Sequence, residues 1–493
     1  MPDRYHIKTV ATPGRFYRVG KFGEVDWRED CSRCFDCVKL KCCFDVYKHE
    51  TEHNRDPRTA TQPLYECKAC MSCVQGCTKG LLTLSVNPEY LDMGDEYWKP
   101  DVLFTTWNQA DTGKIPVSGA GYRGPFHGFG FDSIWTDMSE IVRPTRDGIH
   151  GREYISTSVD VGPKPMRLQF TPDGALVESS LKVLELPVPI VLDVPAWAVR
   201  GAELAEARAR AAQELGTIAA AYVEDAAKLP AELLASVAPV VGCADVSKPG
   251  KQAEGALKAA KLVELLDGTD DEVAKAVEAL AALNPQAIPA VRLTLVPGVY
   301  GRIVELAKRG VKVFHLCADP HGCEVLKGGA QGRHIKDAIR ETHGKLVEAG
   351  IRDEVTLIVS GGIALAEHMA KAIICGADAV GADTALLVAL GCRVCAGAHA
   401  LSVHGGAKDG AAPCPDCPAD GVLAKATEDL QYAAQRMVNL MGAWHSQLIE
   451  VLGAMGIREV RRLRGEMGRA IFMEDIEKDA FGDLEQVPEE VNA

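Results

Sequence analysis

The sequence predicts an α/β fold class: a (β/α)8 TIM barrel, with a cysteine-rich α+β unit before it and a helical tail after it. Three observations predict this architecture. From about residue 115, short apolar runs alternate with long amphipathic stretches rich in Ala, Glu and Lys, which favours parallel strands joined by helices. Most of the 17 cysteines gather in two groups at the two ends of this region. The 493 residues leave room for a barrel of about 250 residues and smaller units beside it.

The composition excludes several classes of protein. Hydrophobic residues make up 47% of the chain and charged residues 25%, which is typical of a folded globular protein and not of a disordered or fibrous one. The net charge of −14 disfavours general nucleic-acid binding. No apolar run approaches the roughly 20 residues of a spanning helix, and the polar start MPDRYHIKTV does not read as a secretory signal. We therefore expect a cytoplasmic protein whose clustered cysteines bind metal.

The eight candidate barrel strands are short and mostly apolar. They cover residues 115–119, 187–194, 217–223, 238–243, 288–296, 311–317, 355–361 and 377–382. A doubly wound sheet is the alternative arrangement of the same elements. In a barrel, the chemistry lies on the loops that follow the carboxyl ends of the strands, which directs attention to the residues there.

Nine cysteines form the N-terminal group. The runs CSRCFDCVKLKCC and CKACMSCVQGCTKG each contain three cysteines at CxxCxxC spacing. This pattern resembles the bacterial two-cluster ferredoxins, in which each run supplies three thiolates to one cubane and its fourth cysteine ligates the other cluster. Zinc is the alternative ligand, but it usually takes two CxxC pairs, so iron–sulfur clusters are favoured.

The ferredoxin resemblance implies two [4Fe–4S] clusters with defined ligands. One cluster is expected on Cys31, Cys34, Cys37 and Cys77, and the other on Cys67, Cys70, Cys73 and either Cys42 or Cys43. The segment KCCFDVY aligns with the usual VCPxxVY ending and favours Cys42. Two features depart from the pattern: the gap between Cys37 and Cys42 is four residues instead of three, and Thr78 replaces the usual proline.

Small residues end the last two predicted strands. Gly361 and Gly362 follow one strand, and Gly381, Ala382 and Thr384 end the next. Small residues there let backbone N–H groups approach a phosphate, and the dipole of a following helix favours the anion. FMN barrels often bind phosphate after strands seven and eight. The alternative is that the glycines only close tight turns.

Ser118 and Gly119, at the end of the first predicted strand, are also expected to line the flavin. The overlapping segment GAGYRG (119–124) fits GxGxxG, but no helix follows it, so we reject a Rossmann dinucleotide site.

A second cysteine group follows the last predicted strand. Cys392 and Cys395 form one CxxC pair, and Cys414 and Cys417 form another after 18 intervening residues. This spacing alone fits structural zinc. A third iron–sulfur cluster, [4Fe–4S] or [3Fe–4S], is favoured because the pair lies close to the predicted flavin loop, where a cluster can pass electrons and zinc cannot.

The order of these parts resembles the FMN-binding synthase domain of glutamate synthases, in the archaeal-type form with an N-terminal ferredoxin. The stretches IVRPTRDGIHGREYISTSVDVG, VSGGIALAEHMAKAIICGADAVGADTALLVALGC and VNLMGAWHSQLIEVLGAMGIREVRRLRGE carry the resemblance. It implies an FMN- and iron–sulfur-dependent oxidoreductase that performs the reductive amination of 2-oxoglutarate to glutamate. It also implies that Gly361, Gly362, Gly381 and Thr384 hold the FMN phosphate.

The resemblance places Arg292 where the family usually has a flavin-contacting lysine. Residues 314–329 replace the family's usual GGTG loop and bring Asp319 and His321 to the end of a predicted strand. A histidine there can donate a proton near neutral pH, so Asp319 and His321 are candidate catalytic residues together with Arg292. The alternative is that these side chains are ordinary hydrogen-bonding residues of the loop.

The predicted organisation has six parts. They are an N-terminal arm (1–25), a two-[4Fe–4S] ferredoxin-like domain (26–90), a linker (91–114), an FMN-binding barrel (115–391), a cysteine-rich cluster segment (392–423), and C-terminal helices with an acidic tail (424–493). An external electron donor, either a ferredoxin or a reductase subunit, and an ammonia-supplying subunit are the expected partners in a hetero-oligomer. The alternative function is that of an electron-transfer subunit with a different substrate or none.

Overall fold

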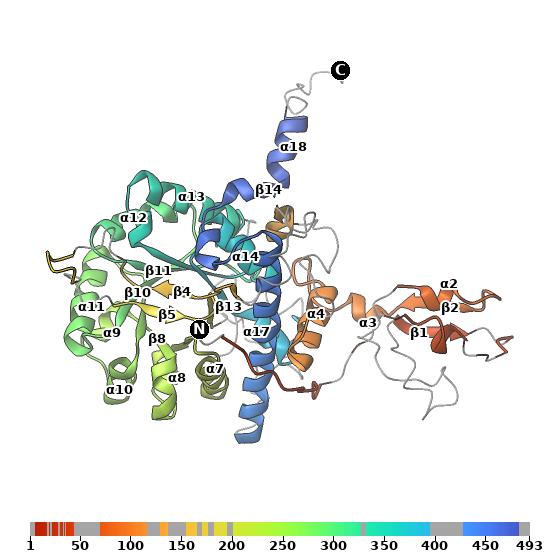
Figure 1. The fold of residues 1–493 in the computed structure, drawn as a ribbon. Helices are drawn as coiled ribbons and strands as arrows, with labels where there is room; N and C mark the ends of the chain where they lie inside the picture. Colours follow the sequence, from red (N-terminus) through yellow and green to blue (C-terminus); the bar gives the residue numbers. More distant parts are fainter. Residues whose placement is uncertain are drawn as a thin grey trace, which may run out of the picture.

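The computed structural model describes residues 5–16, 19, 22–27, 30–32, 34, 36–43, 70–115, 129–136, 154–164, 170–175, 182–194, 201–326, 332–394 and 427–482. Its centre is a closed barrel of eight parallel strands that follow one another in chain order from β6 to β13, with β13 paired to β6 (Figure 1). This confirms the predicted (β/α)8 barrel.

The barrel strands are apolar on both faces because helices cover the outside while side chains fill the inside. All five residues of the strand Thr356–Ser360 are buried, and Val380 pairs with Ile190 to close the barrel. The strands are β6 (Ile190–Leu192), β7 (Ala219–Tyr222), β8 (Val237–Val241), β9 (Leu262–Leu266), β10 (Ile288–Thr294), β11 (Val313–Cys317), β12 (Thr356–Ser360) and β13 (Ala379–Ala382).

Seven of the eight predicted strands overlap these. The predicted strand 115–119 lies, apart from residue 115, outside the described residues, and the barrel is closed by the eight strands that begin at Ile190. The strand that sequence reasoning missed is β9. Its sequence LVELL lies between α10 and α11, whose residues are rich in Ala, Lys and Glu, so it continues a helical pattern instead of interrupting it.

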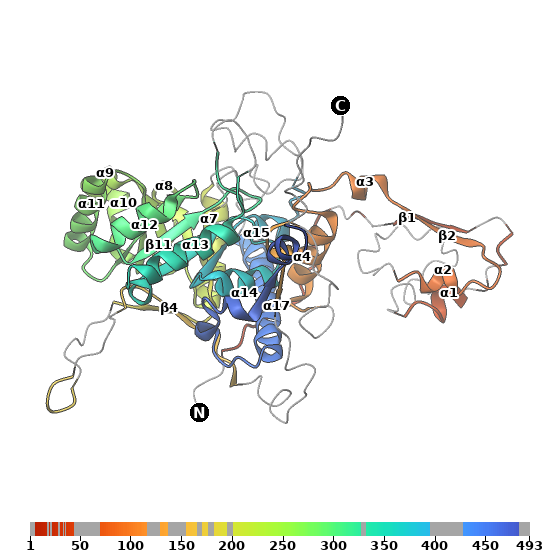
Figure 2. The ribbon, with the colours of Figure 1, turned by 90° about the horizontal axis from the view of Figure 1, so that it is seen from above.

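Helices connect successive strands around the outside of the barrel (Figure 2). They are α7 (Ala202–Leu215), α8 (Val223–Ala226), α9 (Cys243–Val246), α10 (Lys251–Ala259), α11 (Asp270–Leu283), α12 (Val299–Lys308), α13 (Ile335–Glu348), α14 (Ala366–Cys375) and α15 (Thr384–Ala389). A capping box between Thr269 and Glu272 fixes the start of α11, and Gly216, with φ 68°, ends α7.

Two further helices pack against the outer helices of the barrel. The long helix α17 (Thr427–Ala454) packs against α7, α14 and α4 (Pro100–Thr112). The predicted linker 91–114 therefore contains a helix that buries Leu103 and Trp107. The N-terminal arm is also held in place, because the Asn439 side chain accepts from the backbone N–H of Val10 at 3.1 Å and donates to its carbonyl at 2.7 Å.

The cysteine-rich unit lies to one side of the barrel (Figures 1 and 2). Its strands β1 (Phe22–Trp27) and β2 (Leu82–Val86) are antiparallel, and its short helices α1 (Asp36–Lys39) and α2 (Ser72–Gln75) each contain one of the predicted ligands. The short helix α3 (Pro88–Leu91) leads from β2 toward the barrel. This arrangement agrees with the predicted α+β unit.

Two other small sheets complete the structure. Strands β4 (Val159–Val161) and β5 (Leu184–Leu186) form one, and β3 (Ile134–Thr136) and β14 (Ala470–Phe472) form the other. Helix α18 (Met473–Phe481) follows β14 and projects from the body of the protein (Figure 1). None of the described helices combines the length and the apolar character needed to cross a membrane.

The buried pair Arg436–Asp111 ties α17 to α4 and yields a stability prediction. The Arg436 guanidinium is fully buried and donates to the Asp111 carboxylate at 2.6 Å and to the carbonyls of Ala389 and Thr12. Replacing Asp111→Asn leaves this cation without its counter-charge, so we expect a loss of about 3 kcal/mol or more. The apparent unfolding temperature of the cluster-loaded chain measures it.

The matched control is Asp429→Asn, which removes the same charge from the exposed pair Arg15–Asp429. This change is expected to cost less than about 1 kcal/mol. Equal losses in the two variants would contradict the role assigned to the buried pair.

Candidate functional site

A group of polar and charged side chains gathers at the carboxyl end of the barrel. Asp193 directly follows β6, Glu264 lies on β9, Arg292 on β10 and His315 on β11, while Ser360 ends β12. The carboxyl ends of all eight strands meet at the same end of a barrel, which is why residues so distant in sequence come together. We call these five residues the mouth cluster.

Arg292 is the centre of the mouth cluster. Its guanidinium binds both carboxylate oxygens of Asp193, at 2.8 and 2.9 Å, and donates to Glu264 at 2.7 Å. The arginine side chain is 11% exposed, whereas the two carboxylates are fully buried. Burial alone raises the pKa of each acid, but the charges of Arg292 and His315 lower both. Both carboxylates are therefore ionised at neutral pH.

His315 is fully buried, and both of its ring nitrogens have polar neighbours. Its Nδ1 lies 2.8 Å from Glu264 and 3.3 Å from the Arg292 guanidinium, and its Nε2 lies 2.5 Å from the Ser360 hydroxyl and 3.5 Å from Asp193. Burial and the charge of Arg292 lower the pKa of His315, but the neighbouring Cys317, Glu264 and Asp193 raise it well above its usual value. The carboxylates beside the ring therefore favour its protonated form.

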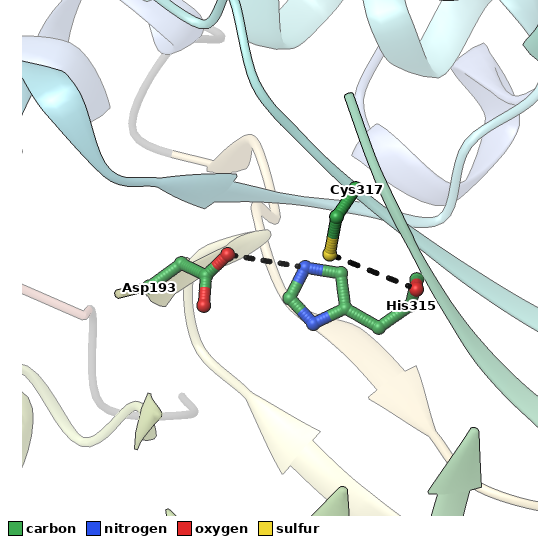
Figure 3. A group of neighbouring side chains, drawn as sticks. All are labelled: Asp193, His315 and Cys317. Carbon is green, nitrogen blue, oxygen red and sulfur yellow. Dashed lines mark hydrogen bonds and ion pairs between the residues drawn. The ribbon is translucent and has the colours of Figure 1, made fainter. Parts of the chain in front are cut away.

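The mouth cluster balances its own charge. Two carboxylates face one guanidinium and one imidazolium. Metal-binding atoms of Asp193, His315 and Cys317 lie within 4.8 Å of one another (Figure 3). However, both oxygens of Asp193 are already bound by Arg292, and both ring nitrogens of His315 already have hydrogen-bonding partners. We interpret the group as an ion network and not as a metal centre.

Asp319 and His321 lie in the loop after β11. One oxygen of Asp319 accepts from the backbone N–H groups of His321 and Cys323, at 2.9 and 2.7 Å. His321 Nε2 pairs with Asp95 at 2.8 Å, and this hydrogen bond raises the pKa of His321. Burial raises the pKa of Asp319. The structure thus places Arg292 in the mouth cluster and the other two predicted catalytic residues in a loop that contacts residue 95.

The predicted phosphate glycines adopt the expected turn. Gly361 and Gly362 have φ of 95° and 69°, and they lead into α14, whose N-cap Leu365 makes no side-chain cap. A Cβ at Gly361 would lie 2.6 Å from the Asp319 carbonyl oxygen, and one at Gly362 would lie 2.6 Å from Cα of Gly322. The two glycines therefore also allow the loop after β11 to pack closely against this turn. This agrees with the alternative interpretation, in which the glycines serve the tight turn itself.

The residues at the end of β13 match the predicted phosphate site only in part. A Cβ at Gly381 would collide with the Ser360 hydroxyl, so this glycine keeps β12 and β13 close. Ala382 ends β13, and Thr384, fully buried, opens α15. The backbone N–H of Thr384 already donates to Asp383, and burial together with Asp193 raises the pKa of Asp383 to about 7.

The amino end of α14 therefore has no side-chain cap, whereas that of α15 is capped by Asp383, and the residues leading into α14 are buried. Ser118 and Gly119 lie outside the described residues.

The predicted cluster cysteines converge in the N-terminal unit. Cys31, Cys37, Cys42, Cys73 and Cys77 pack together around Leu82. The sulfur of Cys77 accepts the N–H of Leu81 at 3.4 Å, and such backbone hydrogen bonds lower its pKa. These features suit thiolate ligands.

Cys43, instead of Cys42, lies beside Cys70, with 3.4 Å between the sulfurs. Cys34, in the N-terminal group, is exposed. Cys392, in the second cysteine group, is buried. Cys67, Cys395, Cys414 and Cys417 lie outside the described residues.

Sequence reasoning missed Asp193, Glu264 and Ser360 as members of the site. The available signal was an ionisable residue inside an otherwise apolar strand, as in LVELL, VRLTLV and VFHLC. Such residues are seldom buried without partners, so several of them on neighbouring strands indicate an internal network.

Comparison with known proteins places this barrel among its relatives. The conserved region of glutamate synthases matches residues 323–458, which include β12, β13, Cys392 and α17. The archaeal-type glutamate synthase (NADPH) of Dehalococcoides mccartyi is 23% identical over 90% of this chain and 93% of its own. The archaeal glutamate synthase (NADPH) of Archaeoglobus fulgidus is 24% identical over 93% of this chain and 96% of its own.

The corresponding protein of Methanocaldococcus jannaschii is 25% identical over 89% of this chain and 93% of its own. A solved flavocytochrome b2 mutant matches with a TM-score of 0.39 and 12% identity, too weakly to support an inference. The conserved region and the near-complete overlap with these relatives confirm the resemblance seen in the sequence: the chain is similar to archaeal-type glutamate synthases over most of its length.

Proposed function

We propose that the chain catalyses the reductive amination of a 2-oxo acid, 2-oxoglutarate to glutamate, with electrons that pass from two N-terminal [4Fe–4S] clusters through a third centre to FMN at the barrel mouth. The observation that carries this proposal is the mouth cluster, because it places a fixed guanidinium and a stored proton at the carboxyl end of the barrel. The region matched by the family model spans β12, β13 and Cys392 and adjoins this cluster. The related proteins are named archaeal-type glutamate synthases, and this name indicates the reaction that we propose.

FMN, when bound, would take up electrons singly and release two of them as hydride. The residues that fit its phosphate are Gly361 and Gly362 with the uncapped amino end of α14. Gly381, Ala382 and Thr384 would lie beside them. Arg292 would present its positive charge to the flavin, held in place by Asp193 and Glu264. Arginine in place of lysine keeps the charge and adds a rigid, two-pronged geometry.

The overall reaction consumes two electrons and two protons: 2-oxoglutarate, ammonium, two electrons and two protons give glutamate and water. His315 can store one of these protons, since the carboxylates beside its ring favour its protonated form. Its Nε2 lies 2.5 Å from the Ser360 hydroxyl, which stands next to Gly361 at the end of the strand. Ser360 therefore offers a route by which a proton leaves the buried ring toward the mouth.

The electron path begins in the N-terminal unit. The ligands we propose are the cysteines named above for the two cubanes, with Cys42 as the fourth ligand of the second, although Cys43 lies nearer to Cys70. Cys392, Cys395, Cys414 and Cys417 would hold the third centre, an iron–sulfur cluster with zinc as the alternative. An external ferredoxin or reductase subunit would supply electrons, and a separate subunit would supply ammonia.

A second candidate is an electron-transfer subunit that keeps the cofactors without this substrate. The altered loop 314–329 favours it, because His315, Asp319 and His321 are occupied by contacts within the protein.

An anaerobic reoxidation experiment separates the two functions. The cluster-loaded chain is reduced chemically, and the flavin absorbance is followed after 2-oxoglutarate and ammonium are added. We expect rapid reoxidation with one glutamate formed per two electrons. Full flavin occupancy without reoxidation would move the assignment to the electron-transfer subunit, and a chain that takes up no flavin would contradict both.

Replacing Arg292→Lys tests the guanidinium. Lysine keeps the charge but cannot bind both oxygens of Asp193, so we expect kcat/KM for the 2-oxo acid to fall roughly 10- to 100-fold while the flavin is retained. Steady-state kinetics and the flavin-to-protein ratio measure this. Arg302→Lys, at an arginine that binds Asp267 and Asp270 on the outside of the barrel, is the matched control. Equal effects in the two variants would refute the assignment.

Replacing Glu264→Gln tests the charge balance. The amide leaves Arg292 and His315 with one carboxylate, so we expect a loss of about 3 kcal/mol at neutral pH. The folded-state pKa of Glu264 is lowered, so its contribution is fully present above the unfolded value of about 4.3 and is lost progressively as the pH falls from there through the lower folded-state pKa. The gap between the unfolding temperatures of the wild type and the variant should therefore narrow steadily as the pH falls below about 4.3.

Glu305→Gln serves as the control, since it removes a charge from an exposed pair with Lys308. A gap between the wild type and Glu264→Gln that persists unchanged at low pH would show that shape, not charge, matters at this position.

A further inference from the structure

A turn formed by residues 93–98 lies between the cysteine-rich unit and the barrel. It follows α3 and precedes α4, so it connects the carboxyl end of the cysteine-rich unit to the barrel, while the N-terminal arm precedes β1 at the other end of the unit (Figure 2). Asp95 shapes the turn by accepting from the backbone N–H groups of Tyr97 and Trp98, at 2.8 and 2.7 Å. Gly94 has φ 72°, and a Cβ there would collide with the Trp98 carbonyl. The turn is thus a defined structure and not a loose connection.

One side of the turn contacts the start of the second cysteine group. The backbone N–H of Gly94 donates to the carbonyl of Arg393 at 3.0 Å, directly after Cys392. The Arg393 side chain also pairs with Glu89 of α3 at 3.2 Å. The turn therefore holds the cysteine-rich unit next to the first proposed ligand of the third centre.

The other side of the turn contacts the barrel loops. Trp98 is fully buried, and its indole N–H donates to the carbonyl of Pro320 at 2.8 Å. The second oxygen of Asp95 pairs with His321 Nε2 at 2.8 Å, and the Tyr97 hydroxyl donates to the carbonyl of Gly362. Asp95 thus uses one oxygen to shape the turn and the other to fasten it to the loop after β11.

The pair Asp95–His321 differs from an ordinary surface ion pair. The Asp95 side chain is 14% exposed and that of His321 34%, and the rings of Tyr97 and His321 lie 5.8 Å apart. Partial burial and fixed neighbours reduce the entropy cost and the screening that make exposed pairs weak. Removal of either partner should loosen the turn without disturbing the mouth cluster, whose residues make none of these contacts among the described residues.

We propose that Asp95 and His321 are positioning residues that fix the 93–98 turn to the barrel, so that the N-terminal clusters deliver electrons to the Cys392 centre and the flavin. This inference rests on the proposed function, because it concerns the electron path of that reaction. It assigns His321 a role in the delivery of electrons instead of the proton donation that the sequence predicts.

The test uses the full cluster-loaded chain with Asp95→Asn, His321→Gln and the double variant. In anaerobic stopped-flow experiments, a reductant reduces the N-terminal clusters, and flavin reduction is followed. We expect it to slow roughly 10- to 100-fold in each single variant, with little further loss in the double variant because the two residues act as one pair. Flavin reoxidation by the 2-oxo acid and ammonium, in enzyme reduced photochemically, should stay at the wild-type rate.

Hydrogen exchange of the 94–98 amides provides a readout independent of turnover. Exchange should rise in both single variants. The control Asp92→Asn removes a charge from an exposed side chain just before the turn and should change neither exchange nor flavin reduction. Unchanged exchange in the variants, or faster exchange with wild-type flavin reduction, would overturn the positioning role. A wild-type chain that binds no flavin would contradict the proposed function. Hydrogen exchange of the 94–98 amides in the same samples would still show whether Asp95 and His321 hold the turn in place.

Discussion

The cost of burying Asp193 and Glu264 is the constraint on which the mouth of the barrel depends. Both carboxylates are withdrawn from water at the ends of strands that close the barrel. A buried carboxylate is tolerated only where cations and hydrogen bonds compensate it. Arg292 and His315 provide that compensation from the two neighbouring strands β10 and β11, whose register places these residues side by side. Loss of any one of the four leaves the buried charges out of balance.

This constraint explains why the site is rigid before any ligand binds. Arg292 is held by three hydrogen bonds to carboxylates, and His315 is held on both sides of its ring. A group held in this way cannot swing to meet a substrate, so the substrate must fit the group. Preorganised charge of this kind is the main means by which enzymes stabilise developing charge.

Much of the fold could be predicted from the sequence, because strand and helix periods alternate strongly in seven of the eight barrel units. The exceptions have physical causes. Strand β9 was missed because it is only five residues long and its composition does not differ clearly from that of the Ala-rich helices on either side of it. Residues 91–114 were interpreted as a linker because the contacts that bury Trp98 and Trp107 come from segments far away in sequence: Trp98 donates to Pro320, and α4, which contains Trp107, packs against α17. The mouth cluster escaped prediction for the same reason: pairing between β9, β10 and β11 is not visible in any one segment.

The loop after β11 accounts for the sequence features that depart most from the family pattern. His315 belongs to the mouth cluster, Asp319 orders the loop through backbone N–H groups, and His321 binds Asp95. The same loop packs against Gly361 and Gly362 so closely that neither position accepts a Cβ. The glycine turn proposed for the phosphate, the loop and the 93–98 turn are therefore in mutual contact. Ordering of the loop by Asp319 therefore supports both of its outward contacts, the one with the glycine turn and the one that His321 makes with the 93–98 turn.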